Sequence, residues 1–189
     1  MLHYARLADK YGIEVLCIGT ELHRTAVERE QDWRRLIADI RTIYGGKLIY
    51  AANWYKEFEE VAFWDDLDYI GIQAYFPLVE EDRLLEAERV PLVKALEQGW
   101  EEHLEAIERI HGKFQRPVII TEVGYRSTID AAVRPWEWES RDTEATSEEQ
   151  LQTQANCYEA FLKAFWKKDF FRRLLLEVVS QLSRRRRPR

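Results

Sequence analysis

The sequence Val-Leu-Cys-Ile-Gly-Thr-Glu at residues 15–21 has the composition of a buried β-strand that ends in a glutamate, and Pro-Val-Ile-Ile-Thr-Glu at residues 117–122 repeats this arrangement. Continuous apolar runs are typical of parallel strands that are covered on both faces. In parallel α/β barrels, residues at the carboxyl ends of the strands line the site, and the helices pack outside. We therefore predict that Glu21 and Glu122 converge on one cleft.

Further strands and helices alternate along the chain. Apolar runs predict strands over residues 47–52 and 68–75, and helical spacing of apolar residues predicts helices over 2–11, 32–44 and 148–167, with one or two more within 79–112. Long crossovers between strands favour a parallel sheet wrapped by helices. Only four strands are predicted, whereas a closed (β/α)8 barrel has eight. The pattern therefore indicates part of a barrel or an open sheet.

Composition and charge exclude several classes of protein. The chain has 189 residues and 46% hydrophobic content, which suits one globular domain. Its net charge is −6, although residues 172–189 contain seven arginines and one glutamate, so the rest is strongly acidic. An acidic body disfavours nucleic-acid binding. No apolar stretch approaches the roughly 20 residues that span a bilayer, and we find no signal peptide. We expect no membrane partner.

Residues typical of metal or redox sites show no suitable pattern. Cys17 lies in a predicted buried strand and Cys157 in a predicted helix, so we interpret both as small apolar core residues. The four histidines lack metal-binding spacing, and the sequence contains neither a phosphate-binding glycine loop nor a serine nucleophile elbow. We therefore predict no metal and no organic cofactor.

The ends of the other two predicted strands carry groups that suit sugars. Asn53 and Trp54 follow one strand, and Gln73 and Tyr75 end the next. Amides hydrogen-bond hydroxyl groups in both directions, and aromatic rings cover the apolar face of a pyranose. Taken singly, Trp54 and Tyr75 are equally compatible with ordinary packing. Together the four strand ends favour a carbohydrate site.

Two carboxyl groups at such a site suit glycosidic bond cleavage, with one as acid and base and the other as nucleophile. Glu21 and Glu122 are the candidates, although Glu21 taken alone is also compatible with a surface glutamate at a strand end. Tyr125 and Trp136, in the segment after Glu122, are further candidates for substrate binding.

Four blocks of the sequence resemble the large clan of retaining (β/α)8-barrel glycoside hydrolases, and within it glycoside hydrolase family 113, the β-mannanase-like group. The blocks are residues 18–22, 47–54, 63–78 and 120–125, and the resemblance covers about residues 1–170. It implies that Glu21 ends the fourth barrel strand as acid/base and that Glu122 ends the seventh as nucleophile. It also implies that Tyr75 hydrogen-bonds the nucleophile. One departure is Thr20, where most of the clan has an asparagine.

The resemblance also implies missing parts. Strands one to three and the eighth strand are not found, so we predict a partial barrel domain over residues 1–171 that contains about strands four to seven. Residues 172–189 form an arginine-rich tail outside the family, for which a shifted reading frame is one explanation. Because we expect a truncated amino terminus, both a cytoplasmic and a secreted location stay open.

The sequence thus predicts a retaining glycoside hydrolase that cleaves β-linked oligo- or polysaccharide, with β-1,4-mannan as the expected substrate. One alternative is a half-barrel without turnover, whose exposed strand edges would allow self-association. Another is a non-catalytic carbohydrate-binding protein, in which sugar binding would not depend on Glu122.

Overall fold

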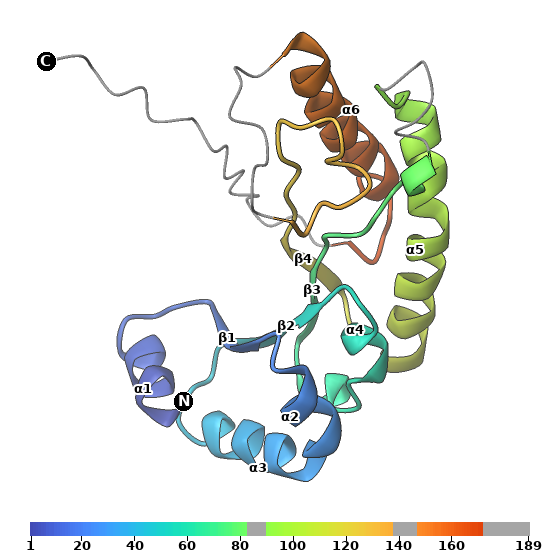
Figure 1. Cartoon of the computed structure of the whole chain (residues 1–189). Helices are drawn as coiled ribbons and strands as arrows, with labels where there is room; N and C mark the ends of the chain where they lie inside the picture. The colour runs from blue at the N-terminus through green and yellow to red at the C-terminus, as the bar shows by residue number, and fades with distance from the viewer. Residues whose placement is uncertain (83–89, 138–146, 172–189) are drawn as a thin grey trace, which may run out of the picture.

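The sheet of this protein is parallel and follows the order of the chain. In a computed structural model, which describes residues 1–82, 90–137 and 147–171, four strands pair in the order β1-β2-β3-β4 (Figure 1). The strands are β1 (Val15–Thr20), β2 (Lys47–Asn53), β3 (Tyr69–Gln73) and β4 (Val118–Glu122). All three strand pairings are parallel. The predicted α/β fold with four parallel strands is confirmed, whereas the predicted tail, residues 172–189, lies outside the described residues.

Helices pack around this sheet. They are α1 (Leu2–Lys10), α2 (His23–Glu28), α3 (Glu30–Arg41), α4 (Glu57–Glu60), α5 (Val93–Phe114) and α6 (Glu148–Phe165), with a 3-10 turn, η1, at Trp64–Asp66. Figure 1 places α1, α2 and α3 beside β1 and β2, and α5 and α6 together beyond β3 and β4. Each long helix buries one apolar stripe, such as Leu96, Trp100 and Leu104 of α5.

The observed boundaries differ from the predicted ones in places. The six-residue α2 was not predicted, and Leu22, the N-cap residue before it, provides no side-chain cap that would have marked its start. Strand β3 ends at Gln73 rather than Tyr75. In contrast, α6 begins where the sequence indicated, with a capping box between Ser147 and Gln150. Part of the predicted helical segment, residues 83–89, lies outside the described residues.

An aromatic cluster fills the space between the sheet and α3. Trp33 stacks on Phe63 with ring centroids 5.3 Å apart, and Tyr50 of β2 meets both rings edge-on. Gly19 of β1 faces this cluster, because a Cβ atom there would lie 2.8 Å from Trp33 and 2.9 Å from Tyr50. The glycine therefore permits the two rings to pack directly beneath the end of β1.

The prediction for Cys17 is wrong, because its side chain is exposed and not part of the core. The physical reason is the position of β1, which pairs only with β2 and is therefore at one edge of the described sheet. Cys157 of α6 is buried as predicted, and burial raises the pKa of its thiol to about 12.

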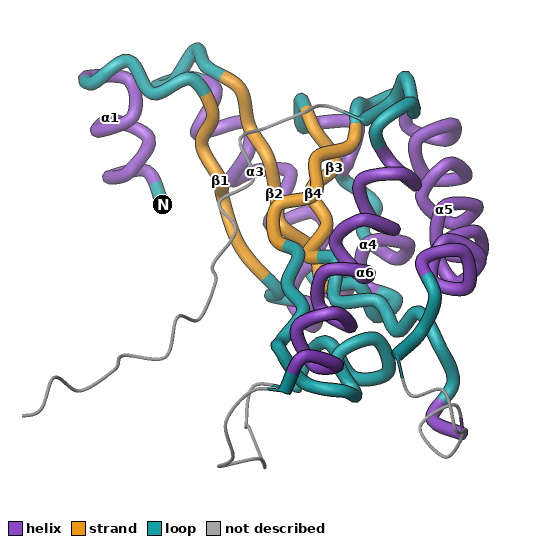
Figure 2. The backbone as a smooth tube through the Cα atoms, turned by 90° about the horizontal axis from the view of Figure 1, so that it is seen from above, coloured by secondary structure: helices purple, strands orange, loops and turns teal. Residues whose placement is uncertain are grey.

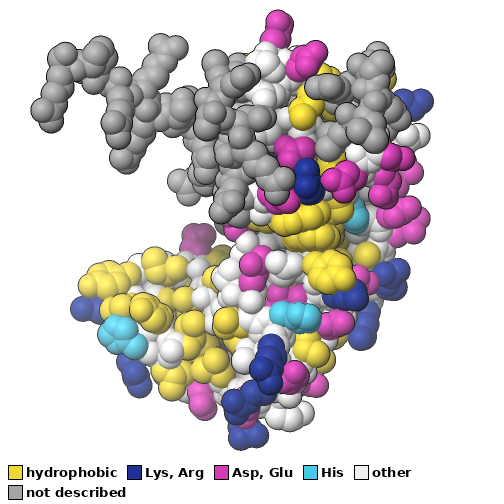
Figure 3. Space-filling view, in the orientation of Figure 1, with side chains coloured by type: hydrophobic (Ala, Val, Ile, Leu, Met, Phe, Trp, Pro, Cys, Tyr) yellow, Lys and Arg dark blue, Asp and Glu magenta, His cyan; other side chains and the backbone are white. Residues whose placement is uncertain are grey.

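Hydrophobic side chains gather on the surface near the amino-terminal end of the chain, over α1 and β1 (Figure 3). Large exposed apolar residues in α1 and in the segment between α1 and β1 are Tyr4, Leu7, Tyr11 and Ile13. An apolar surface beside a strand edge is suited to association, and self-association through this edge stays a prediction. Among the described helices, none has the length and apolar character that crossing a membrane requires.

Candidate active site

The carboxyl ends of the strands bring the predicted site residues to one edge of the sheet. Asn53 of β2 pairs with Gln73 of β3, and Gln73 pairs with Glu122 of β4, so these three residues stand in one row. Glu21 continues the row beyond β1, since its N–H donates to the carbonyl of Ala51 over 2.9 Å. Seen from above, the strands form an arc rather than a flat row (Figure 2).

Glu122 is held by a tyrosine, as the resemblance implies. The hydroxyl of Tyr75 donates to Oε1 of Glu122 over 2.5 Å. Gly124 leaves room for this ring, because a Cβ atom there would lie 3.2 Å from Tyr75 Cε1. The pKa of Tyr75 is strongly raised, first by burial, then by the bond to Glu122 and its charge, and also by the charge of Glu21. Both carboxylates therefore act electrostatically on one phenol.

Glu21 is held by an amide. Nδ2 of Asn53 donates to Oε1 of Glu21 over 2.8 Å, and Oδ1 of Asn53 accepts from the N–H of Tyr55 over 2.8 Å. Glu21 itself has φ = 50°, a left-handed conformation that is uncommon for residues other than glycine. Such backbone strain tends to occur at functional sites. The side chains of both Glu21 and Glu122 are accessible to solvent.

Two tryptophans form an aromatic platform at the same end of the molecule. Trp54 and Trp136 stack with ring centroids 5.0 Å apart and an interplanar angle of 26°. Phe76 supports Trp54 edge-on, and Trp136 keeps 39% of its surface exposed. The two rings come from segments far apart in the sequence, and together they present the kind of face on which a sugar ring stacks.

Tyr125 is the one buried aromatic residue among the predicted site residues after Glu122. Its ring is buried and packs edge-on against Tyr158 of α6, with centroids 5.4 Å apart. Within the described part of the chain its hydroxyl has no hydrogen-bond partner, and complete burial raises its pKa well above the usual value. A role for Tyr125 in substrate binding stays a prediction.

Sequence reasoning missed a buried carboxyl group behind the row of strand ends. Glu57 of α4 is fully buried and accepts hydrogen bonds from Tyr50 and from the backbone of Asn53. Glu57 is followed closely by Glu59 and Glu60, so its position in the sequence does not distinguish it from exposed glutamates. The available signal was Tyr50, because a tyrosine inside an apolar strand needs a partner for its hydroxyl.

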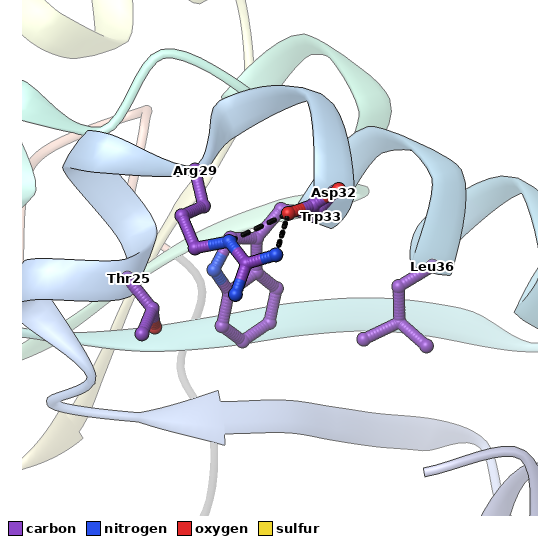
Figure 4. Close-up of a pocket in the computed structure, with 5 residues that line it drawn as sticks. All are labelled: Thr25, Arg29, Asp32, Trp33 and Leu36. Carbon is purple, nitrogen blue, oxygen red and sulfur yellow. Dashed lines mark hydrogen bonds and ion pairs between the residues drawn. The ribbon is translucent and has the colours of Figure 1, made fainter.

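A surface hollow elsewhere contains none of these residues. It has a volume of about 250 Å³ and is lined by Thr25, Arg29, Asp32, Trp33 and Leu36 of the α2–α3 region (Figure 4). Arg29 and Asp32 pair with each other there, so neither charge is left for a ligand. In the described segments, no group of three or more His, Cys, Asp or Glu side chains is arranged to hold a metal ion.

Comparisons with known proteins identify the family and the fold. The sequence model of Glycoside Hydrolase Family 113 matches residues 1–178. The chain is similar to the GH113 β-mannanase AaManA from Alicyclobacillus acidocaldarius in complex with ManMIm, with 30% identity and a TM-score of 0.69 over 90% of this chain and 46% of that one. A GH113 β-1,4-mannanase in complex is 27% identical, with a TM-score of 0.70 over 90% of this chain and 47% of that one.

A β-glucuronidase from Ruminococcus gnavus is 12% identical, with a TM-score of 0.57 over 90% of this chain and 28% of that one, so it shares the fold alone. No curated protein matches the chain. The chain spans about half the length of the GH113 structures that it matches.

Proposed function

Since the chain belongs to glycoside hydrolase family 113, we propose that it carries the two catalytic carboxyl groups of a retaining glycoside hydrolase that cleaves β-1,4-mannan or its oligosaccharides. The predicted family and the predicted partial-barrel fold are confirmed by the family match and by the similarity to GH113 structures. The reaction, the substrate and the residue roles are the proposal.

In the proposed first step, Glu122 attacks the anomeric carbon while Glu21 protonates the departing oxygen, which gives a covalent glycosyl-enzyme. In the second step, Glu21 removes a proton from water, and this water displaces Glu122. The Tyr75 hydroxyl supports the first role, because its raised pKa keeps the proton on Tyr75 and its bond fixes Oε1 of Glu122. Oε2 is then the oxygen that attacks.

The Asn53 amide supports the second role. It fixes Oε1 of Glu21, and therefore Oε2 would exchange the proton with the leaving group and with water. Gln73 lies in register between the two carboxyl-bearing positions, where its amide would meet a sugar hydroxyl. The Trp54–Trp136 platform would hold a neighbouring sugar ring.

One observation carries the proposal more than any other. The two glutamates end different strands at the same sheet edge, and each is held through one oxygen by a neutral donor, Tyr75 or Asn53. Side chains that served only to solvate a strand end would not need fixed partners on neighbouring strands.

Azide rescue separates the two roles. We would assay the chain on mannooligosaccharides and on activated aryl β-mannosides, with Glu21→Ala, Glu122→Ala and the exposed control Glu105→Ala of α5. We expect both site variants to lose activity and the control to keep it. With azide, Glu122→Ala should form the α-mannosyl azide and Glu21→Ala the β-mannosyl azide. Exchanged products would reverse the roles, and an active Glu122→Ala without azide would refute the mechanism.

An inactive or merely binding chain is the alternative, which is favoured by its coverage of only 46% of AaManA. Calorimetric titration with mannotriose would identify it. Binding that Glu122→Gln leaves intact and Trp54→Ala abolishes, in a chain that cleaves no substrate, would indicate a carbohydrate-binding protein.

A further inference from the structure

Glu57 is an unusual residue for its position. It begins α4, the short helix directly after β2, and it has no exposed surface. Glutamate is almost never fully buried unless it is paired, because transfer of its charge from water is costly. Among the described residues Glu57 forms no ion pair, and its partners are a hydroxyl and a backbone amide. Each partner is in turn hydrogen-bonded to Glu21 or to the residue that follows it.

One route runs through Tyr50. The hydroxyl of Tyr50 donates to Oε1 of Glu57 over 2.5 Å and accepts from the N–H of Leu22 over 2.7 Å. Leu22 directly follows Glu21, whose backbone is in the strained left-handed conformation. Because the O–H of Tyr50 donates its hydrogen bond to Glu57, a lone pair of the hydroxyl oxygen is left to accept from the N–H of Leu22. The charge on Glu57 thereby sets the polarity of the bond that anchors the backbone beyond Glu21.

The other route runs through Asn53. Oε2 of Glu57 accepts from the backbone N–H of Asn53 over 2.7 Å. The side chain of the same asparagine donates to Glu21 Oε1 over 2.8 Å. Glu57 therefore fixes the main chain of the residue whose amide holds the Glu21 carboxyl group. One carboxylate oxygen of Glu57 thus acts on the backbone next to Glu21, through Tyr50, and the other acts on the Glu21 side chain, through Asn53.

We propose that Glu57 is a positioning residue for Glu21, which it orients through Tyr50 and Leu22 on one side and through Asn53 on the other. This inference rests on the proposed function, because it assigns the residue that orients Glu21, the proposed acid/base. Proton transfer to a leaving oxygen requires the donor within hydrogen-bond reach. A misplacement of about 1 Å can cost about 100-fold in rate.

The leaving group of the substrate tests this role. Glu57→Gln keeps the shape of the side chain and removes the charge, and Glu59→Gln is the matched control, since Glu59 is on the same helix but exposed and paired with Arg109. We expect Glu57→Gln to lower kcat/KM on mannooligosaccharides about 10- to 100-fold. On 2,4-dinitrophenyl β-mannoside, whose leaving group needs no proton, kcat/KM should stay unchanged. Equal losses on both substrates, or no loss on either, would overturn the inference.

A second measurement does not need activity. In NMR spectra of the chain, Glu57→Gln should shift the signals of the Leu22 backbone amide and the Asn53 side-chain amide and accelerate hydrogen exchange at Leu22. Glu59→Gln should leave both signals in place. If Glu57→Gln fails to fold, Tyr50→Phe takes its place, and it should perturb Leu22 while sparing the Asn53 side chain.

The two kinds of failure are then distinguishable. A chain that cleaves no substrate, yet shows the expected amide changes, contradicts the proposed function and keeps the positioning network. Unchanged amide signals in folded Glu57→Gln refute the network, even if the parent chain is active.

Discussion

Replacement of Tyr50 by phenylalanine removes one oxygen atom from the core, and we expect it to lower the free energy of unfolding by about 2–6 kcal/mol. The estimate comes from two groups that lose a partner, the carboxylate of Glu57 and the N–H of Leu22. Each buried polar group left unsatisfied costs about 1–3 kcal/mol, with charged groups at the upper end. The ring itself stays, so the packing with Trp33 and Phe63 is kept.

Tyr125 offers a control with the same chemical change and the opposite expected sign. Its hydroxyl is buried, and within the described residues it lacks a hydrogen-bond partner. Removal of an unsatisfied hydroxyl relieves a desolvation penalty, so Tyr125→Phe should be neutral or stabilise the fold by about 1 kcal/mol.

Urea denaturation would measure both variants, with tryptophan fluorescence and circular dichroism as independent probes. In a chain of this size, 1 kcal/mol corresponds to about 2–4 °C in Tm. Equal destabilisation by the two substitutions would refute the reasoning, because it would mean that the hydrogen bonds of Tyr50 contribute nothing specific. The same Tyr125→Phe variant tests the predicted substrate role, which requires a raised KM for mannooligosaccharides.

Three further outcomes are expected. Gly124→Ala would bring a methyl group to 3.2 Å from the Tyr75 ring and displace the Tyr75 hydroxyl from Glu122. We therefore expect kcat on mannooligosaccharides to fall about 10-fold with little change in Tm. An unchanged kcat would contradict the proposal that Tyr75 holds the nucleophile. Burial raises the pKa of Asp68, but the Leu48 N–H, Arg41 and Lys47 outweigh burial, so the pKa is lowered. The stabilisation of the fold by the ionised Asp68 is therefore present above about pH 4 and is lost as the pH falls through the pKa of the folded state. Asp68→Asn should lower the free energy of unfolding by about 1–3 kcal/mol at pH 7 and flatten the acid limb of a stability-against-pH curve. Burial lowers the pKa of His103 despite its hydrogen bond to the Pro77 carbonyl. The stabilisation of the fold by neutral His103 is therefore complete above about pH 6.5 and is lost as the pH falls towards the pKa of the folded state. In urea denaturation, the free energy of unfolding of His103→Gln should decline less over this pH range than that of the parent chain, and an identical decline would contradict the prediction.

Much of the sheet could be predicted because its signal is local. Four apolar runs marked the strands, and a polar or aromatic residue after each run marked the edge at which Glu21, Asn53, Tyr75 and Glu122 meet. The Tyr75–Glu122 bond was expected from the family resemblance, and the structure contains it.

The rest depended on neighbours that one sequence does not reveal. Between β2 and α4 the chain passes through Lys56, which has φ = 62°, and the Glu57 carboxylate that follows accepts from the backbone N–H of Asn53. Residue pattern alone gives a glutamate among glutamates. Likewise, Cys17 lies in an apolar run that fits a covered strand, but β1 has a strand neighbour on one side only. Composition reports how apolar a strand is and not where in the sheet it stands.

The order of the strands has a consequence for stereochemistry. Glu21 directly follows β1, the first strand of the sheet, and Glu122 ends β4, the last, so three strand pairings separate them. In a flat sheet these would span about 14 Å, whereas retention of configuration needs carboxyl groups about 5–5.5 Å apart and inversion needs a wider gap. The curvature of the sheet at β2 and β3 would therefore set the distance between the two carboxyl groups. Gly71 of β3 would contribute to it, because a Cβ atom there would lie 2.3 Å from the carbonyl oxygen of Tyr50 and push the two strands apart. A glycine in the middle of β3 would then help to decide which anomer is released.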